Sequence, residues 1–198
     1  MKERPILFSG AMIRAILAGQ KTQTRSVVKP IPQMVTDKSI VPWEGDAAAL
    51  MRLFDQVDRV CPYGQPGDRL WVREAWKAHT TFDHLPPRDI PRSHIWYLAD
   101  SGYKAESRTR ASMHMPRWAS RILLEIVSVR VERLQDISEA DAEAEGIDFL
   151  RHIPDADETL TARDLYECLW DGINGEGSWA ANPWVWVVEF KRVEGQPR

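Results

Sequence analysis

The segment PWVWVVEF, residues 183–190, is apolar on both faces over most of its length. Successive side chains of a strand point to opposite faces, so a strand without a polar face has to be covered on both sides. We therefore expect residues 183–190 to form a central strand of a sheet or small barrel. A second β-branched run covers residues 122–134 and ends in alternating valines, which predicts a long strand that bends or crosses the molecule.

A third strand is expected at RLWVREAW, residues 69–76. Alternation with a period of two places four of its side chains on one face: Leu70, Val72, Glu74 and Trp76. On this apolar face an unpaired carboxylate would be costly, so Glu74 needs a partner. Residues 95–98 predict a further short strand.

Short helices are expected between these strands. Residues 9–19 combine a capping Ser9 with one apolar face and a closing glycine, which is typical of an amphipathic helix. Ser138 and Thr161 are each followed three residues later by an aspartate, as in a capping box. The predicted fold class is therefore α+β, a mixed sheet or small barrel with about three short helices packed against it.

Length and composition restrict the class of protein. The chain has 198 residues, with 26 Lys+Arg, 29 Asp+Glu and a net charge of −3. We expect one domain over residues 1–198, with proline-rich insertions at about 30–67 and 77–94 and one helical patch at 47–54 in the first. A hydrophobic share of 43% excludes disorder over most of the length. Apolar runs are far shorter than the roughly 20 residues of a membrane helix, so we expect a soluble cytoplasmic protein without a membrane partner.

Charge is distributed unevenly along the chain. Residues 104–121 hold five basic side chains against the single Glu106: Lys104, Arg108, Arg110, Arg117 and Arg121. Three of these arginines, at 110, 117 and 121, either meet phosphate or ribose or face water. The acidic stretch 132–167 is expected to form a solvated face. His79 and His84 lack a third ordered ligand, so no metal is expected.

Lys21, Thr24 and Glu74 supply the side-chain types of a catalytic triad: a hydroxyl nucleophile, its base and a carboxylate that orients the base. Thr24 follows Lys21 by three residues, just after the end of the first expected helix. Lys21 is also the candidate partner that Glu74 requires. The alternative is a half-buried Lys21–Glu74 ion pair with Thr24 as an ordinary strand residue, and the spacing alone leaves both interpretations open.

Several ordered blocks of the chain resemble the ASCH domain family, whose fold is PUA-like. They are LAGQKTQTRSVVKP (17–30), GDRLWVREAW (67–76), MPRWASRILLEIVSVRVERLQDISEADAEAEGI (115–147) and NPWVWVVEF (182–190). Small bacterial amidohydrolases of this family act on N4-acetylcytidine with a lysine, a threonine three residues later and a glutamate on a following strand. The resemblance implies these roles for Lys21, Thr24 and Glu74. Thr24 stands where the general family pattern has an acidic residue, which favours the amidohydrolase branch. The arginine that the family usually has two positions later is replaced by Ser26, and Arg25 lies one place earlier.

The resemblance implies acyl transfer without metal or cofactor. Thr24 Oγ would attack the amide carbonyl, Lys21 would take its proton and later protonate the leaving amine, and Glu74 would position Lys21. The modified cytosine nucleoside would contact three further residues: Arg25, Trp76 and Arg117. Trp76 is a candidate stacking ring, although core packing is the interpretation that its place among apolar residues favours. Two alternatives remain, an RNA-binding module without catalysis and a ribonuclease in which Lys21 acts near a 2′-hydroxyl.

Overall fold

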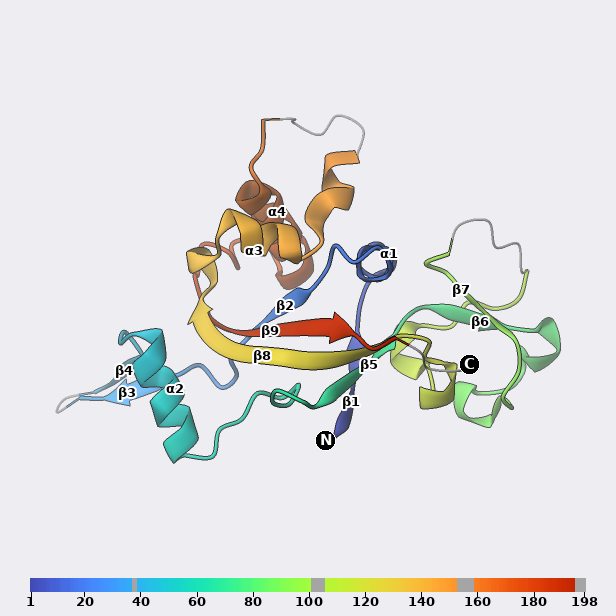
Figure 1. The fold of residues 1–198 in the computed structure, drawn as a ribbon, viewed down its shortest axis with the longest axis horizontal. Helices are drawn as coiled ribbons and strands as arrows, with labels where there is room; N and C mark the ends of the chain where they lie inside the picture. The colour runs from blue at the N-terminus through green and yellow to red at the C-terminus, as the bar shows by residue number, and fades with distance from the viewer. Residues whose placement is uncertain (37–38, 101–105, 153–158, 195–198) are drawn as a thin grey trace.

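The computed structural model describes residues 1–36, 39–100, 106–152 and 159–194. Its central element is a five-stranded sheet (Figure 1) with the strand order β1-β5-β8-β9-β2. The strands are β1 (Glu3–Leu7), β5 (Arg69–Arg73), β8 (Leu123–Arg133), β9 (Trp184–Arg192) and β2 (Gln23–Val27). β1 and β5 are parallel, and the other neighbours are antiparallel. The sheet is therefore mixed and the fold class is α+β, as predicted.

The strand β9 lies inside the sheet, between β8 and β2, and both of its faces are covered. Trp186 and Phe190 pack into the main core on one face, whereas Val185 and Val187 pack into a second core on the other. This confirms the interpretation of PWVWVVEF as a central strand. β8 is long and bends as expected, because its register with β9 shifts between Ile126 and Ser128.

Four α-helices pack against this sheet in the part of the chain that the structure describes. They are α1 (Gly10–Leu17), α2 (Ala47–Gln56), α3 (Glu139–Ala144) and α4 (Ala162–Asn174). Ser9, Ser138 and Thr161 cap α1, α3 and α4, which confirms the three predicted helix starts. In Figure 1, α3 and α4 lie together above β2 and β9, and α2 lies on the other side of β8. The second core is formed between α3, α4 and the outer face of β9.

The predicted strand 69–76 is wrong in its extent. β5 ends at Arg73, and β6 (Trp76–Ala78) pairs with β7 (Ile95–Tyr97) in a separate two-stranded sheet. The backbone of Trp76 bonds to that of Arg110 in both directions, which leads the chain away from the main sheet. This β6–β7 unit has its own small core and lies at the end of the molecule away from α2 (Figure 1). Glu74 stands between the two strands, so it does not share a strand face with Leu70 and Val72.

The first insertion contains regular pairing that the sequence did not predict. β3 (Gln33–Val35) and β4 (Ile40–Pro42) form a hairpin, while the helical patch at 47–54 is confirmed by α2. The remaining short elements are 3₁₀ turns at Thr80–Phe82, Pro87–Asp89, Ser112–His114, Arg117–Ala119, Leu134–Asp136 and Ile147–His152. Most side chains of the hairpin are exposed. The hairpin therefore has no buried face, and its sequence shows no alternation of apolar and polar residues that would predict strands.

The main sheet is open rather than a closed barrel. β1 and β2 are its two edge strands, and no ladder joins them among the described residues. The expectation of a closed small barrel is therefore not met, although both edge strands line one common cavity. None of the helices that the structure describes has both the length and the apolar composition to span a membrane.

Candidate functional site

A cavity of about 410 Å³ lies between the two edge strands of the main sheet. Ile6, Leu7 and Phe8 line it from β1 and the residue after it, and residues 24–27 line it from β2. Helix α4 closes it with Tyr166, Leu169, Trp170, Ile173 and Asn174. The volume lies in the range of small-molecule sites, about 300–1,000 Å³. Of the predicted site residues, Thr24 and Arg25 line this cavity.

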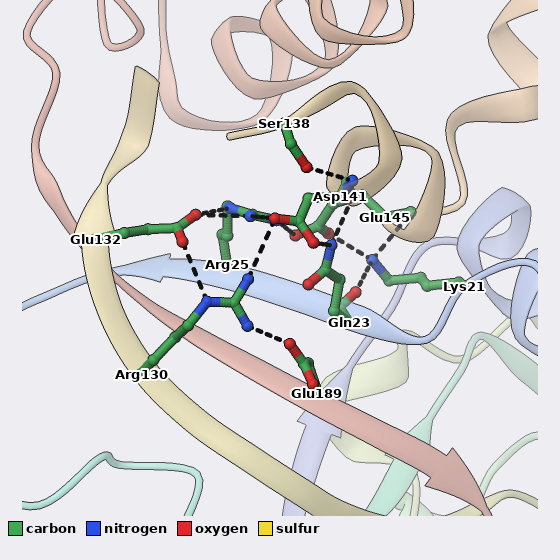
Figure 2. Close-up of polar contacts among 9 residues, drawn as sticks. All are labelled: Lys21, Gln23, Arg25, Arg130, Glu132, Ser138, Asp141, Glu145 and Glu189. Carbon is green, nitrogen blue, oxygen red and sulfur yellow. Dashed lines mark hydrogen bonds and ion pairs between the residues drawn. The ribbon is translucent and has the colours of Figure 1, made fainter. Parts of the chain in front are cut away.

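The side chain of Lys21 is enclosed at the base of β2. Its Nζ donates to the carbonyl oxygen of Gln23 at 2.8 Å, to the carbonyl oxygen of Glu145 at 2.9 Å and to Glu145 Oε2 at 2.8 Å (Figure 2). The exposed fraction of the Lys21 side chain is 0%. An ammonium group has three hydrogens, so these three acceptors satisfy it completely.

Glu145 is the partner of Lys21, and it sits where α3 ends. Its Oε1 accepts from Arg25 Nη1 at 2.9 Å, so one buried carboxylate holds two cations. Gly146 follows, and its φ of 76° lies in the left-handed region that favours glycine. A Cβ on Gly146 would lie 2.7 Å from the Cβ of Lys21 and 2.9 Å from that of Ala15. The glycine therefore allows the end of α3 to approach Lys21 closely.

Arg25 is fixed on the face of β2 that α3 covers. Its guanidinium donates to Glu132 Oε1 at 2.6 and 2.9 Å and lies 3.4 Å from Asp141 Oδ2 (Figure 2). Burial alone would lower the pKa of Arg25, but the carboxylates of Glu145 and Glu132 outweigh that effect and raise the pKa above its usual value. Arg25 therefore holds the wall of the cavity together, and its charge is balanced within the protein.

Thr24 stands on β2 opposite Val188 and is half-buried at the cavity wall. Its hydroxyl makes no hydrogen bond to the described part of the chain. The carbonyl of Gln23, which accepts from Lys21 Nζ, belongs to the peptide bond that precedes Thr24. The ammonium group of Lys21 is therefore a direct neighbour of the Thr24 backbone, and Glu145 lines the same cavity as Thr24.

The predicted pairing of Lys21 with Glu74 is wrong. The carboxylate of Glu74 accepts from Arg121 Nε and Nη2, each at 2.9 Å, and it lines no part of the cavity. Arg121 also pairs with Asp100 and lies 3.9 Å from the ring centre of Tyr97. Burial raises the pKa of Glu74, against the lowering effect of Arg121. Glu74 thus satisfies its need for a partner next to β8 and not at β2.

Trp76 and Arg117, which were expected to contact substrate, lie away from the cavity. Trp76 is 0% exposed and packs in the core of the β6–β7 unit, edge-on to Trp118. Arg117 is half-buried, and its Nε donates to Glu3 Oε2 at 2.9 Å. The core-packing interpretation of Trp76 is the one that the structure supports. Lys104 lies outside the described residues.

Sequence reasoning missed the acidic members of this site. Residues 132–167 were expected to face water, but Glu145 is 3% exposed, and Glu132 and Asp141 contact Arg25. Arg130 extends the network outward to Glu132, Asp141 and Glu189 (Figure 2). Glu145 stands between Ala144 and a glycine at a helix end, and this setting of small residues was the available signal. Residues 153–158 of the acidic stretch lie outside the described part of the chain.

Tyr166 of α4 brings a further polar group to the cavity. Burial raises the pKa of its phenol well above the usual value, and the nearby Glu145 adds to this effect. Tyr166 lines the cavity, and its hydroxyl makes no hydrogen bond within the described ranges. Tyr166 is therefore a protonated hydrogen-bond donor beside Glu145.

No set of three His, Cys, Asp or Glu side chains in the described ranges is arranged to hold a metal ion. Comparison of the chain with protein-family models, with curated proteins and with solved structures found no match. The chemistry of the site is therefore argued from its geometry.

Proposed function

We propose that the chain is an amidohydrolase that removes the acyl group from N4-acylated cytosine nucleosides such as N4-acetylcytidine, and that its domain is of the ASCH type with a PUA-like fold. One observation carries the proposal: Thr24 lies on the wall of a nucleoside-sized cavity, with the Lys21–Glu145 ion pair directly beside its backbone. The triad is then Thr24, Lys21 and Glu145. The mixed sheet whose two edge strands line one cavity supports the fold assignment.

The first half of the reaction forms an acyl-enzyme. Lys21 Nζ passes a proton to Glu145 Oε2, 2.8 Å away, and becomes a neutral amine. On substrate binding, the amine exchanges one of its three acceptors for the Thr24 hydroxyl, since catalytic hydrogen bonds often form only in the complex. Thr24 Oγ1 attacks the acyl carbonyl as Lys21 takes its proton. The C–N bond breaks, and Lys21 returns the proton to the leaving N4 amine.

The second half restores the enzyme. Water attacks the acyl ester of Thr24 while Lys21 accepts a proton from it. The bond between the acyl carbon and Thr24 Oγ1 then breaks, Lys21 gives that proton to Oγ1, and the carboxylic acid leaves. Glu145 finally returns its proton to Lys21, which restores the ion pair. In both halves a negative charge develops on the former carbonyl oxygen. The hydroxyl of Tyr166, which stays protonated, is the donor that stabilises this charge.

The cavity suits a flat base attached to a sugar. Tyr63, Tyr166 and Trp170 contribute aromatic rings to its wall, in place of the ring expected from Trp76. Lys29 stands exposed at its rim, where a ribose or its substituents would leave the cavity. The specificity for a nucleoside therefore rests on β2 and α4 rather than on the β6–β7 unit.

The test is conversion of N4-acetylcytidine to cytidine, followed chromatographically without added metal. We expect activity in the wild type, its loss in Thr24→Ala and Glu145→Gln, and retention in Glu74→Gln, a matched buried carboxylate outside the cavity. Circular dichroism at the assay temperature shows whether each variant is folded. An inactive wild type would refute the proposal, and activity in folded Thr24→Ala would refute the role of the nucleophile.

A second candidate function is RNA binding without catalysis. The observation that favours it is the complete hydrogen bonding of the Lys21 ammonium group. A lysine with a purely structural role, and no part in catalysis, would show the same three hydrogen bonds. RNA binding that survives Thr24→Ala, together with an inactive wild type in the cytidine assay, would select this alternative. Cleavage of the RNA during the same incubation would instead indicate a ribonuclease.

A further inference from the structure

A second cavity, of about 560 Å³, lies in the β6–β7 unit between residues 84–87 and 108–114. It is formed by segments outside the main sheet and shares no lining residue with the cavity at Thr24. Four basic side chains line it: His84, Arg108, Arg110 and His114. Its wall contains no acidic side chain from the described residues.

Arg110 forms a fixed base for this cavity. Its backbone pairs with Trp76, its side chain is 4% exposed, and its guanidinium lies 5.5 Å from the Trp76 ring centre. Nη2 donates to the carbonyl oxygen of Phe82 at 2.8 Å, and Nη1 donates to that of Arg108 at 3.0 Å. The carboxylate of Asp83 is 3.4 Å from Nη1, at the long end of hydrogen-bond distances. The guanidinium is therefore held in place by carbonyl groups and only loosely neutralised.

Arg108 lies at the rim with its backbone anchored and its side chain unpaired. Both carboxylate oxygens of Asp83 accept from the backbone N–H of Arg108 at 3.0 Å. The exposed guanidinium of Arg108 has no partner in the ranges that the structure describes, and the same holds for the exposed rings of His84 and His114. The carboxylate of Asp83 thus contacts the backbone of Arg108 and the side chain of Arg110, but not the guanidinium of Arg108. The rim therefore has an excess of positive charge.

This arrangement is that of an anion site. Two guanidinium groups line a space whose wall has no carboxylate from the described residues, and the two histidine rings add hydrogen-bonding nitrogens. Arg binds phosphate with two parallel hydrogen bonds. A volume of about 560 Å³ exceeds what a free phosphate ion requires, so part of a larger molecule can enter with it. We propose that this cavity binds the phosphate group of a nucleotide or of an RNA strand.

The proposal does not depend on the hydrolase reaction, because it concerns a different cavity. Calorimetric titration with inorganic phosphate and with cytidine 5′-monophosphate tests it on the full chain. We expect saturable binding by the wild type, and about tenfold weaker binding by Arg108→Ala, the effect of losing one charged hydrogen-bond donor. His84→Ala should also weaken binding. Both side chains are exposed, so these variants should fold.

The matched control is Arg88→Ala. Arg88 belongs to the same unit and is 86% exposed, but it does not line the cavity. Equal loss of binding in Arg88→Ala and Arg108→Ala would overturn the proposal, because the net charge of the protein would then explain both losses. The absence of saturable binding in the wild type would also overturn it. A short single-stranded RNA distinguishes the source: tighter binding than the mononucleotide, lost in Arg108→Ala, indicates a strand, and equal binding indicates a single phosphate group.

Discussion

Replacing Glu145 with glutamine separates the stability of the buried network from its chemistry. Glu145 is 3% exposed and holds Lys21 and Arg25, whose side chains are both 0% exposed. In Glu145→Gln the amide accepts one hydrogen bond, but it presents an N–H to the second cation. Arg25 keeps Glu132 and Asp141, whereas Lys21 keeps only two carbonyl oxygens. Lys21 then becomes a buried cation without a counter-charge.

Leaving a buried charge uncompensated costs about 3–5 kcal/mol, so we expect the free energy of unfolding to fall by about that amount. With a urea slope of about 2 kcal/mol per M, the midpoint of unfolding falls by about 1.5–2.5 M. The assay is urea unfolding followed by tryptophan fluorescence and circular dichroism, because coincident transitions show that the two-state treatment applies.

Glu74→Gln provides the comparison for this experiment. Glu74 is 1% exposed and pairs with Arg121, which retains Asp100 after the substitution. We expect destabilisation in both variants, but loss of cytidine release in Glu145→Gln alone. A midpoint in Glu145→Gln within about 0.3 M of the wild type would refute the reasoning about the buried network. Loss of activity in Glu74→Gln, measured where it is folded, would refute the placement of the site.

Three further predictions follow from neighbouring contacts. Gly146→Ala should lower the free energy of unfolding by at least about 2 kcal/mol, because φ is positive at this residue and the new Cβ meets Lys21. Gly172→Ala is the control and should not lower it, because a Cβ at Gly172 lies in open space. Tyr166→Phe should lower kcat about 100-fold with little change in KM, as expected for one lost oxyanion donor, and an unchanged kcat would exclude that role. Asp171 accepts from the backbone of Trp179 and Gly177 and from the Ser178 hydroxyl, which lowers its pKa below the unfolded value. The contribution of Asp171 to stability is therefore present above its unfolded pKa and is lost as the pH falls through its lower folded pKa. In Asp171→Asn the melting temperature should fall less steeply with pH between these two pKa values than it does in the wild type.

Local signals in the sequence predicted the elements with strong patterns. Capping residues placed α1, α3 and α4, and apolar runs placed β8 and β9. The end of β5 at Arg73 was not predictable, because the alternation continues through Trp76 and only the long-range pairing of Trp76 with Arg110 interrupts it. The openness of the sheet also depends on contacts between distant strands, which no local pattern reports.

The site was predicted in part, for the same reason. Lys21 and Thr24 are close in sequence, and the structure keeps them together at β2. The carboxylate is different, because Glu74 and Glu145 are both distant from Lys21 in the chain. Glu74 stood out as a charge in an apolar strand, whereas Glu145 was one of many acidic residues, and only the approach of α3 to β2 distinguishes them.

The open seam between β1 and β2 affects how a ligand can be recognised. Every second residue of an edge strand directs its amide and carbonyl groups away from its neighbour, and here both edges border the cavity at Thr24. A ligand in this cavity can therefore hydrogen bond to main-chain groups, which every substitution except proline leaves in place. Side chains on β2 and α4 can then change during evolution without removing those main-chain groups from the cavity.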